Sequence, residues 1–139
     1  MNAIARKYQE VFSLEKEEAS EMAQMTQGYP FAFQVLGYLT YNQNGDYREV
    51  QDDYRQYLED YVYDKIWSEL SEKDKLVAKA IAQEETGKVI EIRKRLDMDT
   101  NSFNPYRKRL IRKGIVDGSD RGIVKFVLPL FSEYVLDNI

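Results

Sequence analysis

The sequence predicts a mainly α-helical protein: a three-helix bundle in residues 1–70, followed by a winged helix-turn-helix with a small two-stranded β wing in residues 71–139. Apolar residues recur at helical spacing through the first part. In the second part, three helix-length segments precede a hairpin pattern, which is the order of elements in a winged helix. Residues 1–70 carry 6 Lys/Arg and 13 Asp/Glu, whereas residues 71–139 carry 14 Lys/Arg and 11 Asp/Glu. The basic second part is therefore the candidate for an anionic partner.

Three helices are expected in the first part, over residues 15–26, 30–41 and 47–70. Ser13 is the expected N-cap of the first helix, because its hydroxyl can accept a hydrogen bond from a free amide of the first turn. Gly28 ends that helix and Pro30 begins the next, since proline is tolerated in the first turn of a helix. The apolar faces, in chain order, comprise Ala19, Met22, Ala23 and Thr26; Ala32, Val35, Leu36 and Leu39; and Val50, Tyr54, Leu58, Tyr61, Ile66 and Leu70. Short connections between such helices predict a small bundle.

The second part is expected to begin with a helix capped by Ser71, with Asp74 completing a capping box. Thr86–Gly87 end this helix. Residues 89–96 form either a second short helix or a strand followed by a helix. The side chains expected to face the core on the first of these helices are Leu76, Val77, Ala80 and Ile81.

A third helix is expected from Thr100 to Lys113, with Pro105 near its first turn and Gly114 as its C-terminal stop. Two short apolar runs, 115–118 and 123–128, flank a turn at 120–122 and predict the β-hairpin of the wing. Pro129 ends the second strand. A final helix returns to the core through Leu130, Phe131, Tyr134 and Val135.

Several classes of chemistry are excluded by composition. The chain contains no cysteine and no histidine, which excludes disulfides, thiolate zinc sites and histidine general bases. The phosphate-loop pattern G-x-x-x-x-G-K-[ST] and the nucleophile pattern G-x-S-x-G are absent. The longest apolar runs are too short to span a membrane, and residues 1–6 do not resemble a signal peptide. We therefore expect a cytoplasmic protein with no catalytic residue, no metal site, no cofactor of its own and no membrane partner.

The third helix of the second part carries the candidate binding face. With about 100° per residue, Phe103, Tyr106 and Leu110 turn toward the core and polar residues turn outward. An outward basic helix can enter a major groove, where Lys and Arg meet phosphates or guanine and Asn can read adenine. The same face can instead bind another protein or simply be solvated. The candidate residues for binding DNA or a partner are Asn104, Lys108, Arg109 and Arg112 on the helix, and Arg121 and Lys125 on the wing.

Other charged and aromatic groups have simpler interpretations. Arg107 lies beside the core side of the helix and is expected to pair with an acidic neighbour. The run Arg93–Arg95 is expected to be a solvated face. The tyrosines between Tyr54 and Tyr63, with Trp67, are expected to pack at the junction of the two parts. A stacking platform for single-stranded nucleic acid is disfavoured there, because carboxylates between Asp52 and Asp64 repel phosphate.

Four segments resemble one family of proteins. Residues 26–38 (TQGYPFAFQVLGY) resemble the lid-helix segment of prokaryotic AAA+/STAND-type P-loop ATPases, in the archaeal-ATPase and Orc/Cdc6-like group. Residues 67–74 (WSELSEKD) resemble the junction into the winged helix of that family. Residues 106–116 (YRKRLIRKGIV) resemble its third helix and first wing strand, and residues 124–131 (VKFVLPLF) its second strand and exit.

The resemblance implies a role for the first part as a lid. In that family the G-x-P element faces the bound nucleotide, which assigns a nucleotide-facing role to Gly28 and Pro30 only. The residues that follow, 31–33 (FAF), include no arginine that would sense a γ-phosphate. The Walker A and Walker B parts, with ATP and Mg²⁺, would belong to an N-terminal P-loop ATPase domain of a parent chain, so this chain should not hydrolyse ATP.

The resulting expectation is a non-catalytic, C-terminal regulatory region. Its lid would contribute to nucleotide sensing, and its winged helix would contact DNA or a protein. The alternative is a free-standing winged-helix transcriptional regulator that binds DNA.

Overall fold

The computed structural model describes residues 2–138 and is mainly helical, with one small antiparallel sheet. The chain divides into two compact units, Met1–Val62 and Tyr63–Ile139. The outer bounds of the two predicted parts, residues 1 and 139, lie outside the described residues. In the part of the chain that is described, no helix is long and apolar enough to cross a membrane.

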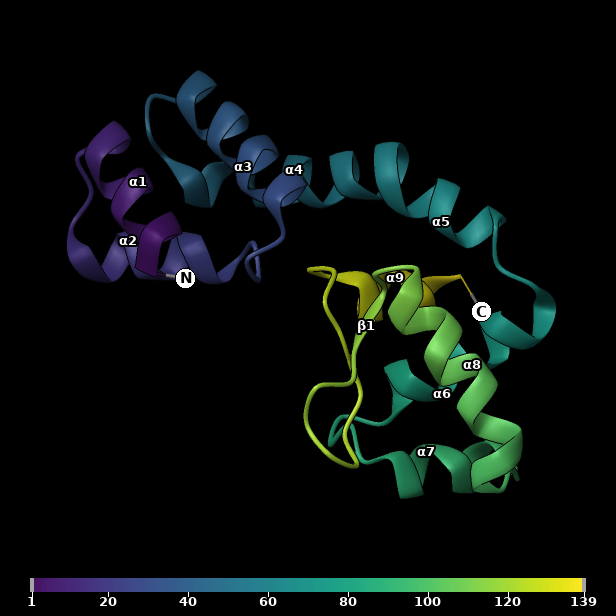
Figure 1. Cartoon of the computed structure of the whole chain (residues 1–139). Coiled ribbons are helices and arrows are strands. Elements are labelled where there is room, and N and C mark those ends of the chain that lie inside the picture. The colour runs from purple at the N-terminus through teal and green to yellow at the C-terminus, as the bar shows by residue number, and fades with distance from the viewer. Residues whose placement is uncertain (1, 139) are drawn as a thin grey trace. The chain divides into compact units, whose positions relative to one another are not determined.

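The first unit contains α1 (Asn2–Phe12), α2 (Lys16–Gln24), α3 (Pro30–Asn42), a 3₁₀ turn (Tyr47–Val50) and α4 (Gln51–Leu58). Figure 1 shows α1 and α2 side by side at the purple end of the colour scale. The apolar faces predicted for 15–26 and 30–41 are confirmed, except that Leu39 is only half-buried. The helix α1 was not predicted. Tyr8 anchors it by stacking on Phe33 at 4.9 Å and by donating a hydrogen bond to the Phe33 carbonyl at 2.6 Å.

The start of α2 corrects one cap. Ser13 has a left-handed backbone (φ 54°) and does not cap the helix. Glu15 is the N-cap instead, and its amide donates to Glu18 Oε1 at 3.4 Å. A carboxylate at this position accepts from the same free amides that we assigned to the Ser13 hydroxyl.

The long helix predicted over 47–70 is interrupted. After α4 the chain makes a π-helical turn (Glu59–Tyr63) and then continues as α5 (Asp64–Ser68). A π turn adds a residue per turn and so rotates the face of the helix that follows. Tyr61, predicted to be buried, is therefore exposed, and Tyr63 is buried instead.

The second unit contains α5, α6 (Glu72–Gln83), α7 (Val89–Leu96), α8 (Thr100–Arg112), the strands β1 (Val116–Asp117) and β2 (Lys125–Phe126), and α9 (Phe131–Asp137). Its aromatic core joins the end of the π turn to α9, because Tyr63 packs edge-on against Phe131 at 5.0 Å and donates a hydrogen bond to the Pro129 carbonyl. Trp67 of α5 packs edge-on against Tyr134 of α9 at 6.2 Å. These contacts explain why the two units divide before Tyr63 and not after Leu70, where the sequence placed the boundary.

The helices of the second unit follow the predicted order. Ser71 and Asp74 form the expected capping box of α6. Val77, Ala80 and Ile81 are buried as expected, whereas Leu76 is exposed. In Figure 1 the helices α6, α7 and α8 lie together, and α9 returns to pack on α6.

Candidate interaction surface on the second unit

The helix α8 is oriented by its cap and by two buried side chains. Asp99 is the N-cap, and its Oδ1 accepts from the Ser102 amide at 2.8 Å. This hydrogen bond holds the pKa of Asp99 below its ordinary value. Phe103 and Leu110 are fully buried on the inner side, as predicted. The outer side of α8 is thereby fixed toward solvent.

The outward residues of α8 are those that the helical rotation indicated, with one exception discussed next. Lys108 and Arg112 are exposed, and Asn104 is half-buried. Pro105, predicted near the first turn, is the sixth residue of the helix and lies inside it. A proline there cannot donate to the carbonyl of Asn101, so the helix lacks that one backbone hydrogen bond.

Arg109 is the exception, because its guanidinium is already engaged inside the unit. Its Nε and Nη2 both lie 3.1 Å from Asp74 Oδ1, and the Asp74 side chain is only 5% exposed. The guanidinium also sits 5.2 Å from the ring centre of Tyr106. Asp74 thus has two roles, since its other oxygen completes the cap of α6. Arg109 is better described as a link between α6 and α8 than as a free binding residue.

Arg107 forms a second link, from α8 to the hairpin. Its Nη2 donates to the Gly118 carbonyl at 2.9 Å, so its partner is a backbone oxygen and not the acidic side chain that we predicted. A Cβ atom on residue 118 would lie 2.7 Å from that nitrogen and 2.8 Å from Ile111 Cδ1. Glycine at this position therefore permits the close approach of hairpin and helix. The sequence placed Gly118 only at the end of the first run of the hairpin.

The hairpin has shorter strands than predicted. Val116 pairs with Phe126, and Asp117 pairs with Lys125. Asp117 accepts from the Ser119 amide at 2.9 Å, which lowers the pKa of its carboxyl group. Arg121 is exposed in the turn.

A third segment extends this small sheet. Lys88 and Ile123 form an isolated antiparallel bridge, and the Gly87 carbonyl accepts from the Val124 amide at 2.8 Å. Gly87 has φ +72°, and a Cβ atom there would lie 2.8 Å from the Val124 carbonyl oxygen. The residue that we predicted as a helix breaker therefore also fits against the hairpin. Of the two alternatives left open for residues 89–96, the helix is observed, with the bridge residue directly before it.

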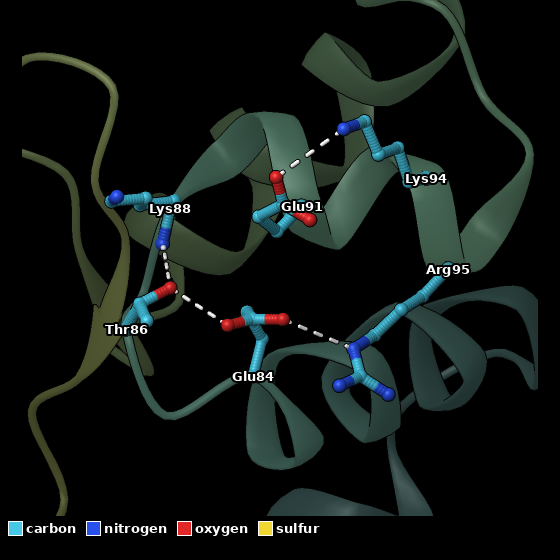
Figure 2. A network of polar contacts seen from close by, with 6 residues as sticks. All are labelled: Glu84, Thr86, Lys88, Glu91, Lys94 and Arg95. Carbon is cyan, nitrogen blue, oxygen red and sulfur yellow. Dashed lines mark hydrogen bonds and ion pairs between the residues drawn. The ribbon is translucent and has the colours of Figure 1, made fainter.

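The basic run Arg93–Arg95 is engaged by its neighbours. Figure 2 shows Arg95 directed at Glu84 and Lys94 directed at Glu91. The two ion pairs have N···O distances of 3.2 and 3.3 Å. Hydrogen bonds from the Thr86 hydroxyl and from Arg95 keep the pKa of Glu84 below its ordinary value. Arg93 donates to the Thr100 hydroxyl at 2.7 Å. Arg93 and Arg95 thus link α7 to its neighbours, whereas Lys94 pairs within α7, and Lys94 and Arg95 are exposed as expected for a solvated face.

The remaining cations define the candidate surface. Within residues 3–138, several exposed basic side chains on or next to α8 and on the hairpin make no ion pair within 4 Å. They are Lys108, Arg112, Lys113, Arg121 and Lys125. We call this set the cationic face. Lys113 was not among the predicted residues, although its position directly after α8 was visible in the sequence.

In the first unit, the proposed nucleotide-facing residues form an exposed turn. Gly28 has φ +75°, and its amide donates to the Thr26 hydroxyl at 3.2 Å. Pro30 is the first residue of α3. The local geometry accounts for both residue types, because only glycine adopts this φ without strain and proline fits the first turn. In the described part of the chain, no group of three or more acidic side chains is placed to hold a metal ion.

The sequence model of one protein family matches residues 60–135 and is described as a domain of unknown function (DUF8462). The chain belongs to this family. The match begins in the π-helical turn and ends in α9, so it covers α5 to α8, the hairpin, most of α9 and the whole cationic face. Neither curated proteins nor solved structures gave a match.

Proposed function

We propose that the second unit is a winged-helix module that binds duplex DNA through its cationic face. The observation that carries the proposal is the separation of its basic side chains into two groups. Near α8 and the hairpin, Arg107 and Arg109 have partners within the unit, as Arg93, Lys94 and Arg95 have on α7, although Lys94 and Arg95 stay exposed. Within the described residues, Lys108, Arg112 and Arg121 are exposed without an ion pair, and so are Lys73 and Lys88 elsewhere in the unit. The order α6, α7, α8 and hairpin, with the bridge at Lys88, also supports a winged helix.

In this proposal α8 enters the major groove, which is wide enough for one helix. Lys108 and Arg112 are one helical turn apart and would contact phosphates or guanine on the same side. Arg121 at the hairpin turn would contact a neighbouring phosphate. Asp117 and Asp120 lie on the same hairpin and oppose this contact, so we expect moderate rather than tight binding.

The direct test is fluorescence anisotropy of a labelled duplex at two salt concentrations. Each phosphate contact contributes about 0.9 to the slope of log affinity against log salt, so a face of this size predicts a slope between about −3 and −4.5. Absence of binding at low salt would remove the proposal.

A protein-facing role is the second candidate, and one observation favours it. Ile111 lies between Lys108 and Arg112 in the sequence of α8 and is 36% exposed, which suits a mixed apolar and charged interface. In this reading the second unit regulates a P-loop ATPase to which it is joined. Lys108→Glu should then change the ATPase activity or assembly of the parent protein in the absence of DNA, and unchanged behaviour would argue against this role.

For the first unit, we propose from the resemblance of residues 26–38 that Gly28 and Pro30 face a nucleotide. ATP and Mg²⁺ would be held by an N-terminal P-loop domain of a longer polypeptide, and this chain would perform no catalysis itself. Gly28, in the turn before α3, and Pro30, at the start of α3, are both exposed, which supports this role.

The parent chain can be tested by the intact mass of the native protein in its source cells, combined with a peptide map. A mass well above 16.4 kDa, with a peptide carrying G-x-x-x-x-G-K-[ST], would support the nucleotide-facing role. A native product of 16.4 kDa would exclude it and would leave the free-standing DNA-binding regulator.

A further inference from the structure

The first unit displays aromatic side chains on the outer side of α3. Phe31, Tyr38 and Tyr41 are 37%, 64% and 72% exposed. Their spacing places them on one side of the helix, opposite the buried residues Ala32 and Leu36. The thirteen residues of α3 include no charged side chain. This side of the helix therefore lacks the lysines and glutamates that usually keep an exposed helix soluble.

Two rings from the next helical segment extend this surface. The ring of Tyr57 lies 6.3 Å from that of Phe31, and the ring of Tyr61 lies 4.5 Å from that of Tyr57. Tyr61 is 68% exposed, because the π turn moves it outward. We call the five residues Phe31, Tyr38, Tyr41, Tyr57 and Tyr61 the tyrosine face.

Such a surface is typical of a binding site. Single exposed apolar residues are common on protein surfaces, but a group of exposed rings is rare outside interfaces. Tyrosine is also enriched among the residues that dominate binding energy, because a large rigid ring with a polar end loses little entropy when it is covered.

The electrostatic surroundings of the tyrosine face are negative. Residues 51–61 include the acidic side chains of Asp52, Asp53, Glu59 and Asp60 and a single basic one, Arg55, which pairs with Asp52 at 3.1 Å. Asp53 precedes Tyr57 by one helical turn and therefore lies on the same side of α4. Residues 1–62 as a whole carry 5 Lys/Arg and 11 Asp/Glu. This excess of negative charge repels nucleic acid and anionic lipid and attracts cations.

We propose that the tyrosine face binds a cationic, amphipathic helical segment of another protein. Aliphatic side chains of that segment would cover the rings of α3. Its Lys or Arg side chains would lie over tyrosine rings and beside Asp53 and Asp60, where cation–π attraction and ion pairing act together. This inference is independent of both proposed functions, since it uses neither the cationic face nor the Gly28–Pro30 turn.

The experiment titrates the full chain with an 18-residue amphipathic peptide of Leu and Lys, and with a peptide of the same pattern in which Glu replaces Lys. Binding is followed by amide shifts in ¹H–¹⁵N spectra. We expect only the Lys peptide to shift the amides of α3 and α4, with the largest shifts at Tyr38, Tyr57 and Tyr61. Equal shifts of these amides by the Glu peptide, or Lys-peptide shifts centred outside α3 and α4, would overturn the proposal.

Matched variants distinguish binding at the tyrosine face from nonspecific hydrophobic binding. Tyr38→Ser with Tyr61→Ser should weaken binding at least about tenfold, a typical loss when two interface anchors are removed. Ile90→Ser removes an apolar side chain of α7 that is also largely exposed, at 53%, and should leave affinity unchanged. Asp53→Asn with Asp60→Asn should weaken binding and reduce its salt dependence. Because all of these side chains are exposed, circular dichroism should report unchanged folding.

Sedimentation of the protein alone tests whether a second copy of the chain occupies the tyrosine face instead. We expect a monomer at all concentrations used for the titration. A dimer that Tyr38→Ser with Tyr61→Ser dissolves would assign the face to a second copy of the chain and would overturn the proposal.

Discussion

At the scale of single residues, two arginines of the same helix in the second unit differ in what they contact. Arg109 and Arg112 are one turn apart in α8, yet Arg109 reaches the buried carboxylate of Asp74 and Arg112 points to solvent. The rotation of the helix could be predicted from the sequence, because it depends only on the spacing of Phe103 and Leu110. The ion pair could not, because it joins residues 35 positions apart.

The two arginines predict opposite effects on stability. Arg109→Ala leaves the Asp74 carboxylate buried without its cation and should lower the free energy of unfolding of the second unit by about 2 kcal/mol. Arg112→Ala should change it by less than about 0.5 kcal/mol. Urea unfolding measures both values. Equal effects of the two substitutions would show that Arg109 is not a structural link.

Two glycines with nearly the same φ angle provide a second comparison. Gly87 and Gly114 both have left-handed φ angles, of +72° and +75°, but only at Gly87 would a Cβ atom meet backbone, at 2.8 Å from the Val124 oxygen. Gly114→Ala should cost about 1 kcal/mol from backbone strain.

Gly87→Ala carries the same strain and must also push the hairpin away, so it should cost clearly more, about 2–3 kcal/mol. Thermal unfolding of the two variants gives the comparison. If Gly87→Ala is no worse than Gly114→Ala, the segment before α7 does not hold the hairpin.

At the scale of helices and strands, the helix ends predicted from the sequence are those marked by a capping or stop residue nearby in the chain. Ser71 and Asp74 mark the start of α6, and Gly114 marks the end of α8. The π turn had no such local signal, and Tyr63 at its end contacts Phe131 and Pro129, which are far along the chain. Leu76 fits the apolar spacing of α6 and is nevertheless exposed, since spacing alone does not show which helix face is covered.

The cap of α8 predicts a dependence on pH. The pKa of Asp99 is lowered from 3.8 by its hydrogen bonds with Ser102. A depressed folded pKa contributes stability that is present above the unfolded value and is lost as the pH falls through the folded value. The advantage of the wild type over Asp99→Ala should therefore shrink as the pH falls below about 4.

Asp99→Asn is the control for this effect, because asparagine also caps a helix but does not titrate. The stability difference between Asp99→Asn and Asp99→Ala should stay constant over the same range. Chemical denaturation at several pH values measures both differences. A constant advantage of the wild type in acid would show that Asp99 does not cap α8 through its charged form.

At the scale of the whole molecule, the chain consists of two units of different charge and different surface. The core of the second unit is internal to residues 63–138, and the family match covers residues 60–135. We therefore expect a fragment of residues 60–139 to fold cooperatively by itself. Circular dichroism and a single thermal transition test this, and a fragment without helical signal would contradict the division.

The cationic face is the central claim, and the salt dependence of DNA binding tests it most directly. The measurement compares wild type, Lys108→Ala with Arg112→Ala, and Lys73→Ala, which removes an exposed cation of α6 outside the face. We predict that the double substitution makes the slope of log affinity against log salt about 1.8 less steep, from two phosphate contacts at 0.9 each, while Lys73→Ala leaves it unchanged. Equal slopes for all three proteins, or no DNA binding by the wild type, would contradict the account.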